Sequence, residues 1–101
     1  MEDYVIAINS DGRVEAFYID ENSTVMHVWQ LKSSNKTVWS QPRPLFDPSS
    51  NPNSALTNAT RVSAATGRDG QIQVVAYTRE NKYFTCYQES GTWNGWFEIT
   101  Q

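Results

Sequence analysis

The sequence predicts an all-β protein built from two copies of one four-stranded unit. Three observations support this fold class. Apolar residues alternate with a period of two in six short runs, and clusters of turn-forming residues separate these runs. The segment at 11–30 also returns 58 positions later, at 69–88. No stretch combines a helical apolar stripe with capping residues, so we expect almost no helix.

The six runs are rich in Val, Ile, Tyr, Phe and Thr, which suit a pleated, half-buried surface. An Asp-Gly pair lies after the first run of each copy, at Asp11-Gly12 and at Asp69-Gly70, where a tight hairpin is expected. The predicted strands are Tyr4–Ile8, Arg13–Ile19, Thr24–Leu31, Arg61–Ala65, Gln71–Thr78 and Lys82–Gln88.

The two copies share a pattern more than an identity. Only three of the twenty aligned positions are identical, an Asp, a Gly and a Gln in each copy. The preceding strands match after a one-residue slip, which places Val5-Ile6-Ala7 against Val62-Ser63-Ala64. Beyond the copies, Trp39 corresponds to Trp93, and each opens a predicted fourth strand.

Four strands in a period of about 50 residues are typical of a β-propeller blade. We therefore predict a single two-blade unit over residues 1–101, with blade one at about 1–47 and blade two at about 61–101. A loop at 46–60, rich in Pro, Asn and Ser, joins them. It is either a solvated spacer or a functional loop.

Two blades alone would leave two broad sheet faces in water. The strand at 13–19 has apolar residues on both of its faces, and monomers rarely expose large apolar patches. The chain is therefore expected to self-associate through a heterologous contact that closes into a ring. Three chains would give a six-bladed propeller, the commonest of the sizes that fit; rings of four or eight blades are the alternatives.

Composition excludes several function classes. The net charge of −3 offers no basic surface for nucleic acid, and no apolar run is long enough to insert into a membrane. The first residues lack a secretory signal pattern, which leaves localisation open and is compatible with cytoplasmic synthesis and non-classical release. His27 and Cys86 show no metal-ligand spacing, and most carboxylates lie at turns, so we expect no cofactor, no metal and no catalysis.

The segments Asp-Gly-Arg-Val-Glu-Ala-Phe at 11–17, Val-Met-His-Val-Trp-Gln at 25–30 and Trp-Asn-Gly-Trp at 93–96 resemble the repeat of PLL-like (tectonin-type) β-propeller lectins. This resemblance implies sugar pockets for fucose and related monosaccharides between neighbouring blades. The architecture is also similar to that of trimeric two-blade fucose-binding lectins. Their Arg and Glu clamp is not matched, however, because Glu15 and Met26 stand near the corresponding positions of the first copy.

A sugar pocket needs an aromatic ring against the C–H face of the sugar and planar polar groups for its hydroxyls. The first copy places Arg13 with Glu15 on one face of a strand, and His27 with Trp29 on one face of the next. Trp96 is expected to be the exposed stacking residue, beside a turn at Asn94-Gly95. The candidate carbohydrate-binding residues are Arg13, Glu15, His27, Trp29, Trp39, Gln71, Gln73, Tyr87, Trp93 and Trp96.

Each candidate also has a structural interpretation. Arg13, Glu15 and His27 could be solvated surface residues, and Trp39 and Trp93 could pack at blade edges. The predicted function is that of a multivalent lectin for fucosylated or similar glycans. The alternatives are a protein-interaction propeller without sugar affinity and a glycosidase-like propeller fragment.

Overall fold

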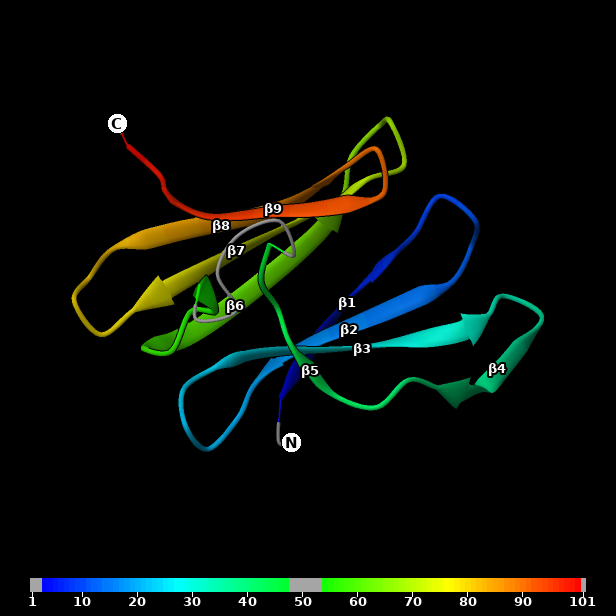
Figure 1. Ribbon diagram of the computed structural model, residues 1–101, viewed down its shortest axis with the longest axis horizontal. Helices are drawn as coiled ribbons and strands as arrows, with labels where there is room; N and C mark the ends of the chain where they lie inside the picture. Colours follow the sequence, from blue (N-terminus) through cyan, green and yellow to red (C-terminus); the bar gives the residue numbers. More distant parts are fainter. Residues whose placement is uncertain (1–2, 48–53, 101) are drawn as a thin grey trace.

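A computed structural model of the chain describes residues 3–47 and 54–100 and contains two antiparallel sheets (Figure 1). The first sheet has the order β1-β2-β3-β4, with β5 also paired to β3, and the second has the order β6-β7-β8-β9. Almost no helix is present in these residues, and none could cross a membrane. The all-β prediction is therefore confirmed. The strands are β1 (Tyr4–Ile8), β2 (Val14–Ile19), β3 (Val25–Lys32), β4 (Asn35–Trp39), β5 (Arg43–Pro44), β6 (Ala59–Thr66), β7 (Ile72–Thr78), β8 (Tyr83–Glu89) and β9 (Thr92–Glu98).

Each of the six predicted runs corresponds to one strand, and the observed ends differ from the predicted ends by two residues at most. The largest difference is at β6, which begins at Ala59 rather than at Arg61. The predicted loop at 46–60 is therefore shorter at its C-terminal end, and its residues 48–53 lie outside the described part of the chain.

The internal repeat is visible in the strand register. Ala16 pairs with Ile6 and Val28, and the residue 58 positions after Ala16, Val74, pairs with Ala64 and Cys86. The same offset therefore relates the first three strands of both sheets, and the one-residue slip predicted for the first strand is wrong. The slip matches Val5 with Val62 and Ala7 with Ala64, whereas the 58-residue offset relates residues that lie on equivalent faces of the two sheets.

The three identical residues of each copy make the same local contacts. The Gly has a positive φ in its turn, 89° in the first copy and 80° in the second. The Asp Oδ1 accepts a hydrogen bond from the N–H two residues later, and the Gln side-chain oxygen accepts one from the first N–H of the strand that follows that turn. The identical pairs are Asp11 and Asp69, Gly12 and Gly70, and Gln30 and Gln88. Identity is thus kept where backbone groups need a specific partner.

The fourth strand differs between the copies. Trp39 pairs with Gln30 as Trp93 pairs with Gln88, which confirms the predicted match of the two tryptophans. The first sheet, however, does not have one fourth strand that opens on Trp39. Trp39 ends β4, Ser40 N–H still donates to the Trp29 carbonyl, and strand pairing with β3 resumes at the two-residue β5. Pro42 lies in the break, and a proline has no N–H to donate to the neighbouring strand.

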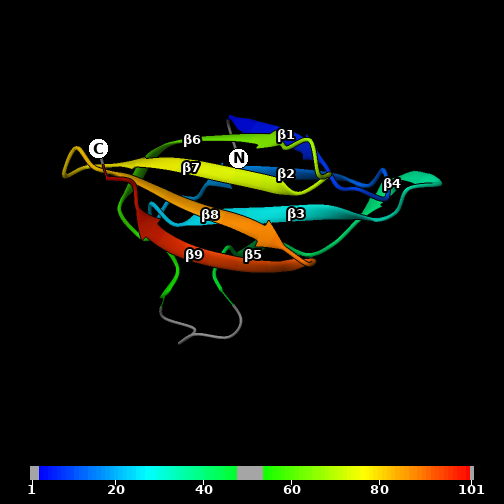
Figure 2. The same ribbon diagram turned by 90° about the horizontal axis from the view of Figure 1, so that it is seen from above.

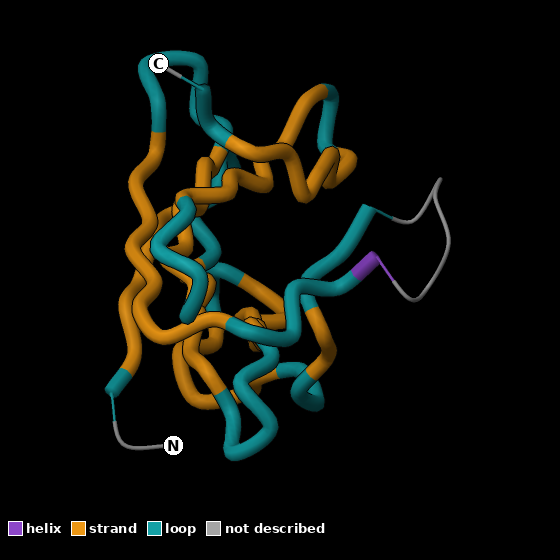
Figure 3. The backbone as a smooth tube through the Cα atoms, turned by 90° about the vertical axis from the view of Figure 1, so that its left-hand side faces the viewer, coloured by secondary structure: helices purple, strands orange, loops and turns teal. Residues whose placement is uncertain are grey.

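The two sheets pack with one face against each other. Strands β1 and β6 lie beside each other, and the remaining strands follow in the same order in both sheets (Figure 2). Seen from the side, two groups of strands extend from this shared edge (Figure 3). The buried core residues are Ala7, Phe17, Val25, Leu45, Ala59, Ile72, Val74, Ala76 and Cys86. Odd-numbered residues of β1–β3 therefore meet even-numbered residues of β7 and β8.

Each sheet also has an outer face that nothing in the described chain covers. In the first sheet this open face carries Tyr4, Ile6 and Ile8, of which each is more than half exposed. In the second sheet the open face carries Gln73, Val75, Tyr83, Thr85, Tyr87 and Phe97. Tyr83 is 49 % exposed and Phe97 is 50 % exposed. Covering apolar surface of this kind removes it from water and lowers the free energy of the system.

Candidate functional site

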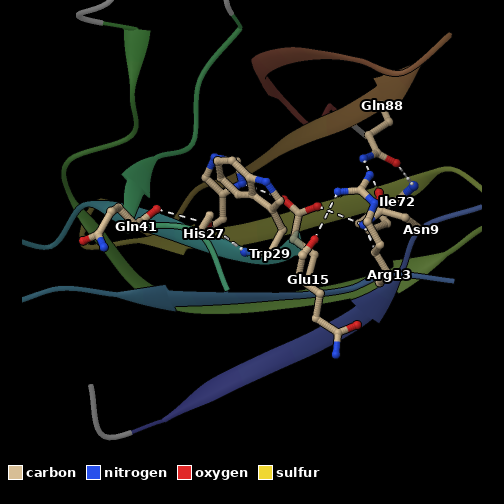
Figure 4. Close-up of polar contacts among 10 residues, drawn as sticks. Asn9, Arg13, Glu15, His27, Trp29, Gln41, Ile72 and Gln88 are labelled. Atoms are coloured by element: carbon tan, nitrogen blue, oxygen red, sulfur yellow. Dashed lines mark hydrogen bonds and ion pairs between the residues drawn. The ribbon is translucent and has the colours of Figure 1, made fainter. Parts of the chain in front are cut away.

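A carboxylate and an imidazole form a buried pair between the two sheets (Figure 4). The register of β2 and β3 sets Phe17 opposite His27 and Glu15 opposite Trp29. Glu15 Oε2 lies 2.6 Å from His27 Nδ1, and the two residues are only 4 % and 8 % exposed. A carboxylate can only accept, so Nδ1 carries the hydrogen. The sequence correctly grouped these residues, but their interpretation as solvated surface groups is wrong.

An amide network ties this pair to the second sheet. Asn9 Nδ2 donates to Glu15 Oε1 at 3.1 Å, and Gln88 Nε2 donates to Asn9 Oδ1 at 2.9 Å. Figure 4 shows this series of hydrogen bonds, from Gln88 on β8 through Asn9 in the β1–β2 turn to Glu15 on β2. Sequence analysis missed Asn9. The available signal was its position before the Asp-Gly turn, where the second copy has Gly67, which has no side chain.

Aromatic rings surround the pair. The His27 ring stacks on Phe17 at 6.1 Å between centroids, lies 4.8 Å from Trp29, and is nearly perpendicular to Trp93 at 6.0 Å. Within the described part of the chain, every buried side-chain nitrogen or oxygen has a hydrogen-bond partner. We call this arrangement of Asn9, Glu15, His27, Trp29 and Trp93 the closed seam. Within it, Asn9 Nδ2, both Glu15 carboxylate oxygens and His27 Nδ1 are bonded to each other.

Trp96 does not have the expected exposed position. It is the extra residue of a bulge in β9, between the pairs Cys86–Gly95 and Thr85–Phe97. Its ring packs against the core, and Nε1 donates to the Leu45 carbonyl at 2.8 Å. The expectation of an exposed stacking residue is therefore wrong, because the bulge turns Trp96 toward the first sheet.

Three candidates from the second copy line one open hollow. Gln71, Gln73 and Tyr87 border a space of about 700 Å³ at the edge of the open face of the second sheet. The amide of Gln73 donates to Thr85 Oγ1 at 3.0 Å, and Thr85 donates in turn to the Val74 carbonyl. The Gln73 side chain is exposed yet held by this bond. The hollow combines an aromatic ring with amides and, at its border, the charged residues Arg68, Asp69 and Glu89.

The two remaining candidates lie apart from these groups. Arg13 Nε forms an ion pair with Asp11 Oδ2 at 2.7 Å, and these hydrogen bonds lower the pKa of the Asp11 carboxyl. Trp39 lies opposite Gln30, and therefore on the other face of the first sheet from Glu15. Its Nε1 donates to the Lys36 carbonyl at 3.0 Å. The candidates are thus divided between the closed seam, the open hollow and three separate places: Trp96 at the core, Arg13 beside Asp11, and Trp39 on the open face of the first sheet.

The thiol of Cys86, the one cysteine of the sequence, is expected to be unreactive in the folded protein. Cys86 is buried, and its burial, together with the charge of Asp47, raises the pKa of the thiol to about 12. In residues 3–47 and 54–100, no group of three or more His, Cys, Asp or Glu side chains could hold a metal ion.

No protein-family model and no curated protein sequence matches the chain. The resemblance to propeller lectins therefore stays a prediction.

Proposed function

We propose that this protein is a carbohydrate-binding lectin whose ligand, fucose or a related monosaccharide, occupies the hollow on the second sheet. The observation that carries the proposal is that Gln71, Gln73 and Tyr87, three residues chosen for sugar chemistry, line one accessible space. The closed seam supports it less, because Glu15 and His27 are buried and the Glu15 carboxylate already accepts from Asn9 and from His27 Nδ1.

The lining suits a neutral ligand with many hydroxyls. The Tyr87 ring offers a flat apolar surface to sugar C–H groups, and each Gln amide can both donate to and accept from neighbouring hydroxyls. A monosaccharide has few atoms, so a single site of this kind binds in roughly the micromolar-to-millimolar range. No step of this proposal involves a chemical reaction, and we assign no catalytic residue.

We further propose that the two sheets are blades of a β-propeller completed by other copies of the chain. The packing of the two sheets supports this, because one face of the first sheet already meets the opposite face of the second. The two faces that remain open are the counterparts of these two, and both carry exposed large apolar side chains. Repeating the contact between chains would close a ring, with three chains giving six blades. Several sites on one ring gain avidity of ~10²–10⁴ on a glycan-coated surface.

A glycan array, read together with the mass of the protein in solution, tests both parts. We expect fucose-type ligands to be bound, free sugar to compete, and a mass three times that of the chain. Tyr87→Ala should weaken binding at least about tenfold, as expected for loss of an aromatic anchor. Gln41→Ala, which changes an exposed residue in the connection between β4 and β5, is the control and should bind as the parent does.

The same measurements distinguish the alternatives. Binding to a glycoprotein that free sugar does not displace would indicate a protein-interaction module. Turnover of an aryl glycoside would indicate a glycosidase. A monomeric mass at micromolar concentration would contradict the ring.

A further inference from the structure

We propose that ligand is held only at the seam between copies, and that Trp39 of the next copy supplies one wall of that site. Each chain would then bind one ligand, although it contains the repeat twice. This inference rests on the proposed function and names the residues of the same site. It follows from comparing the seam inside the chain with the seam that the open faces would form.

The seam inside the chain shows how the sheets meet. Trp93 of β9 reaches the first sheet, where its ring is nearly perpendicular to those of Phe17 and His27, at 5.8 Å and 6.0 Å between centroids. Phe17 and His27 are direct neighbours across β2 and β3. A tryptophan from the fourth strand of one sheet therefore covers a neighbouring pair on the next.

The register transfers this contact to the open faces. Trp39 lies opposite Gln30 just as Trp93 lies opposite Gln88, so Trp39 projects on the open face of the first sheet. On the open face of the second sheet, Val75 and Thr85 form the neighbouring pair that corresponds to Phe17 and His27. When the same packing is repeated between chains, Trp39 of the next copy lies against Val75 and Thr85.

Side-chain size leaves space in this second seam. Val75 replaces a phenylalanine that is completely buried, and Thr85 replaces the histidine that stacks on it. A Trp at the same backbone distance would meet less side-chain volume, and interiors of proteins are otherwise filled closely. The seam between copies therefore contains a cleft where the seam inside the chain contains packed rings.

The polar groups differ in the same sense. Inside the chain, Asn9 accepts from Gln88 and donates to Glu15, so its side chain fills the space between these two residues. At the equivalent place in the second copy stands Gly67, which cannot bridge Gln73 to anything. Gln73 is exposed where Glu15 is buried. The cleft would thus offer an amide, a Tyr87 ring and, from the next copy, an indole wall.

Mixing two inactive variants tests whether the site is shared between chains. Trp39→Ala damages one half of each seam, and Tyr87→Ala damages the other half. Each variant alone should lose glycan binding at least about tenfold. After the two are unfolded and refolded together, about one quarter of the seams pair two intact halves in a ring, and binding should return in proportion. Trp39→Phe, which keeps an aromatic wall, should retain most of the binding.

Cross-linking tests the seam without any sugar. Chains carrying Trp39→Cys are mixed with chains carrying Thr85→Cys and treated with a short bis-maleimide. Cys86 does not compete, because it is buried and its thiol pKa is raised to about 12. We expect covalently linked dimers in the mixture and not in either variant alone.

The outcomes are separable. No linked dimer in the mixture would overturn the seam, whatever the protein binds. Linked dimers without binding of any glycan by the parent protein would leave the seam standing and refute the sugar. Two ligands per chain by calorimetry, or no recovery on mixing, would overturn the shared site even if the parent protein is a lectin.

Discussion

Replacement of Glu15 by alanine should be the most informative test of the closed seam. Glu15 is 4 % exposed and accepts from Asn9 Nδ2 at 3.1 Å and from His27 Nδ1 at 2.6 Å. Alanine removes both acceptors and the apolar stem of the side chain. His27 Nδ1–H is then left buried without the partner that it has in the native protein.

The expected cost follows from these contacts. A buried polar group that loses its hydrogen-bond partner costs about 1–3 kcal/mol. Asn9 Nδ2 keeps a second acceptor, the Arg13 carbonyl at 3.1 Å, so the loss is concentrated at His27. We therefore expect Glu15→Ala to lower the free energy of unfolding by about 1–3 kcal/mol.

The repeat offers a matched control. Gln73 occupies the same repeat position but is exposed, so Gln73→Ala should change stability by less than about 0.5 kcal/mol. Both variants are unfolded in urea and followed by tryptophan fluorescence. Protein concentration is held constant, because assembly couples stability to it. If the two substitutions cost the same within error, the Glu15–His27 pair does not hold the sheets together as argued.

Two further predictions concern the second sheet. Gly95→Ala should have a free energy of unfolding about 1–3 kcal/mol lower than Gly91→Ala, measured by urea unfolding. A Cβ at Gly95 would lie 2.8 Å from the Cys86 Cα, while nothing lies within 4 Å of a Cβ at Gly91. Equal unfolding midpoints would contradict this. Both glycines have positive φ, so that cost is shared by the pair. Cys86, with its thiol pKa raised to about 12 by burial, should resist iodoacetamide at neutral pH in the folded protein and react fully in urea; rapid labelling of the native protein would show that the site opens.

Much of the fold followed from local pattern. The β1 strand at Tyr4–Ile8 was predicted without error, and both Asp-Gly turns lie between paired strands. These features depend on neighbours in the sequence. Alternation with a period of two makes a strand, and a glycine at positive φ makes a tight turn. The break between Trp39 and β5 was missed, although Pro42 marks it in the sequence.

The candidate site was predicted less completely. The sequence correctly placed Glu15 with His27, because residues on one face of adjacent antiparallel strands meet. It could not show that this face is buried. Trp96 was misplaced for a related reason: the bulge that turns it inward arises from pairing with β8 and leaves no local sequence signal beyond Gly95.

The sequence by itself determined the strands, the turns and the fact that one unit occurs twice. Only the tertiary structure decided which face of each sheet is covered, and hence that Glu15 is buried while Gln73, its repeat partner, is exposed. The physical reason is that alternation assigns residues to two faces but does not show which face is buried when both carry apolar residues. Which face is buried depends on the other sheet, whose contacts join residues many positions apart in the chain.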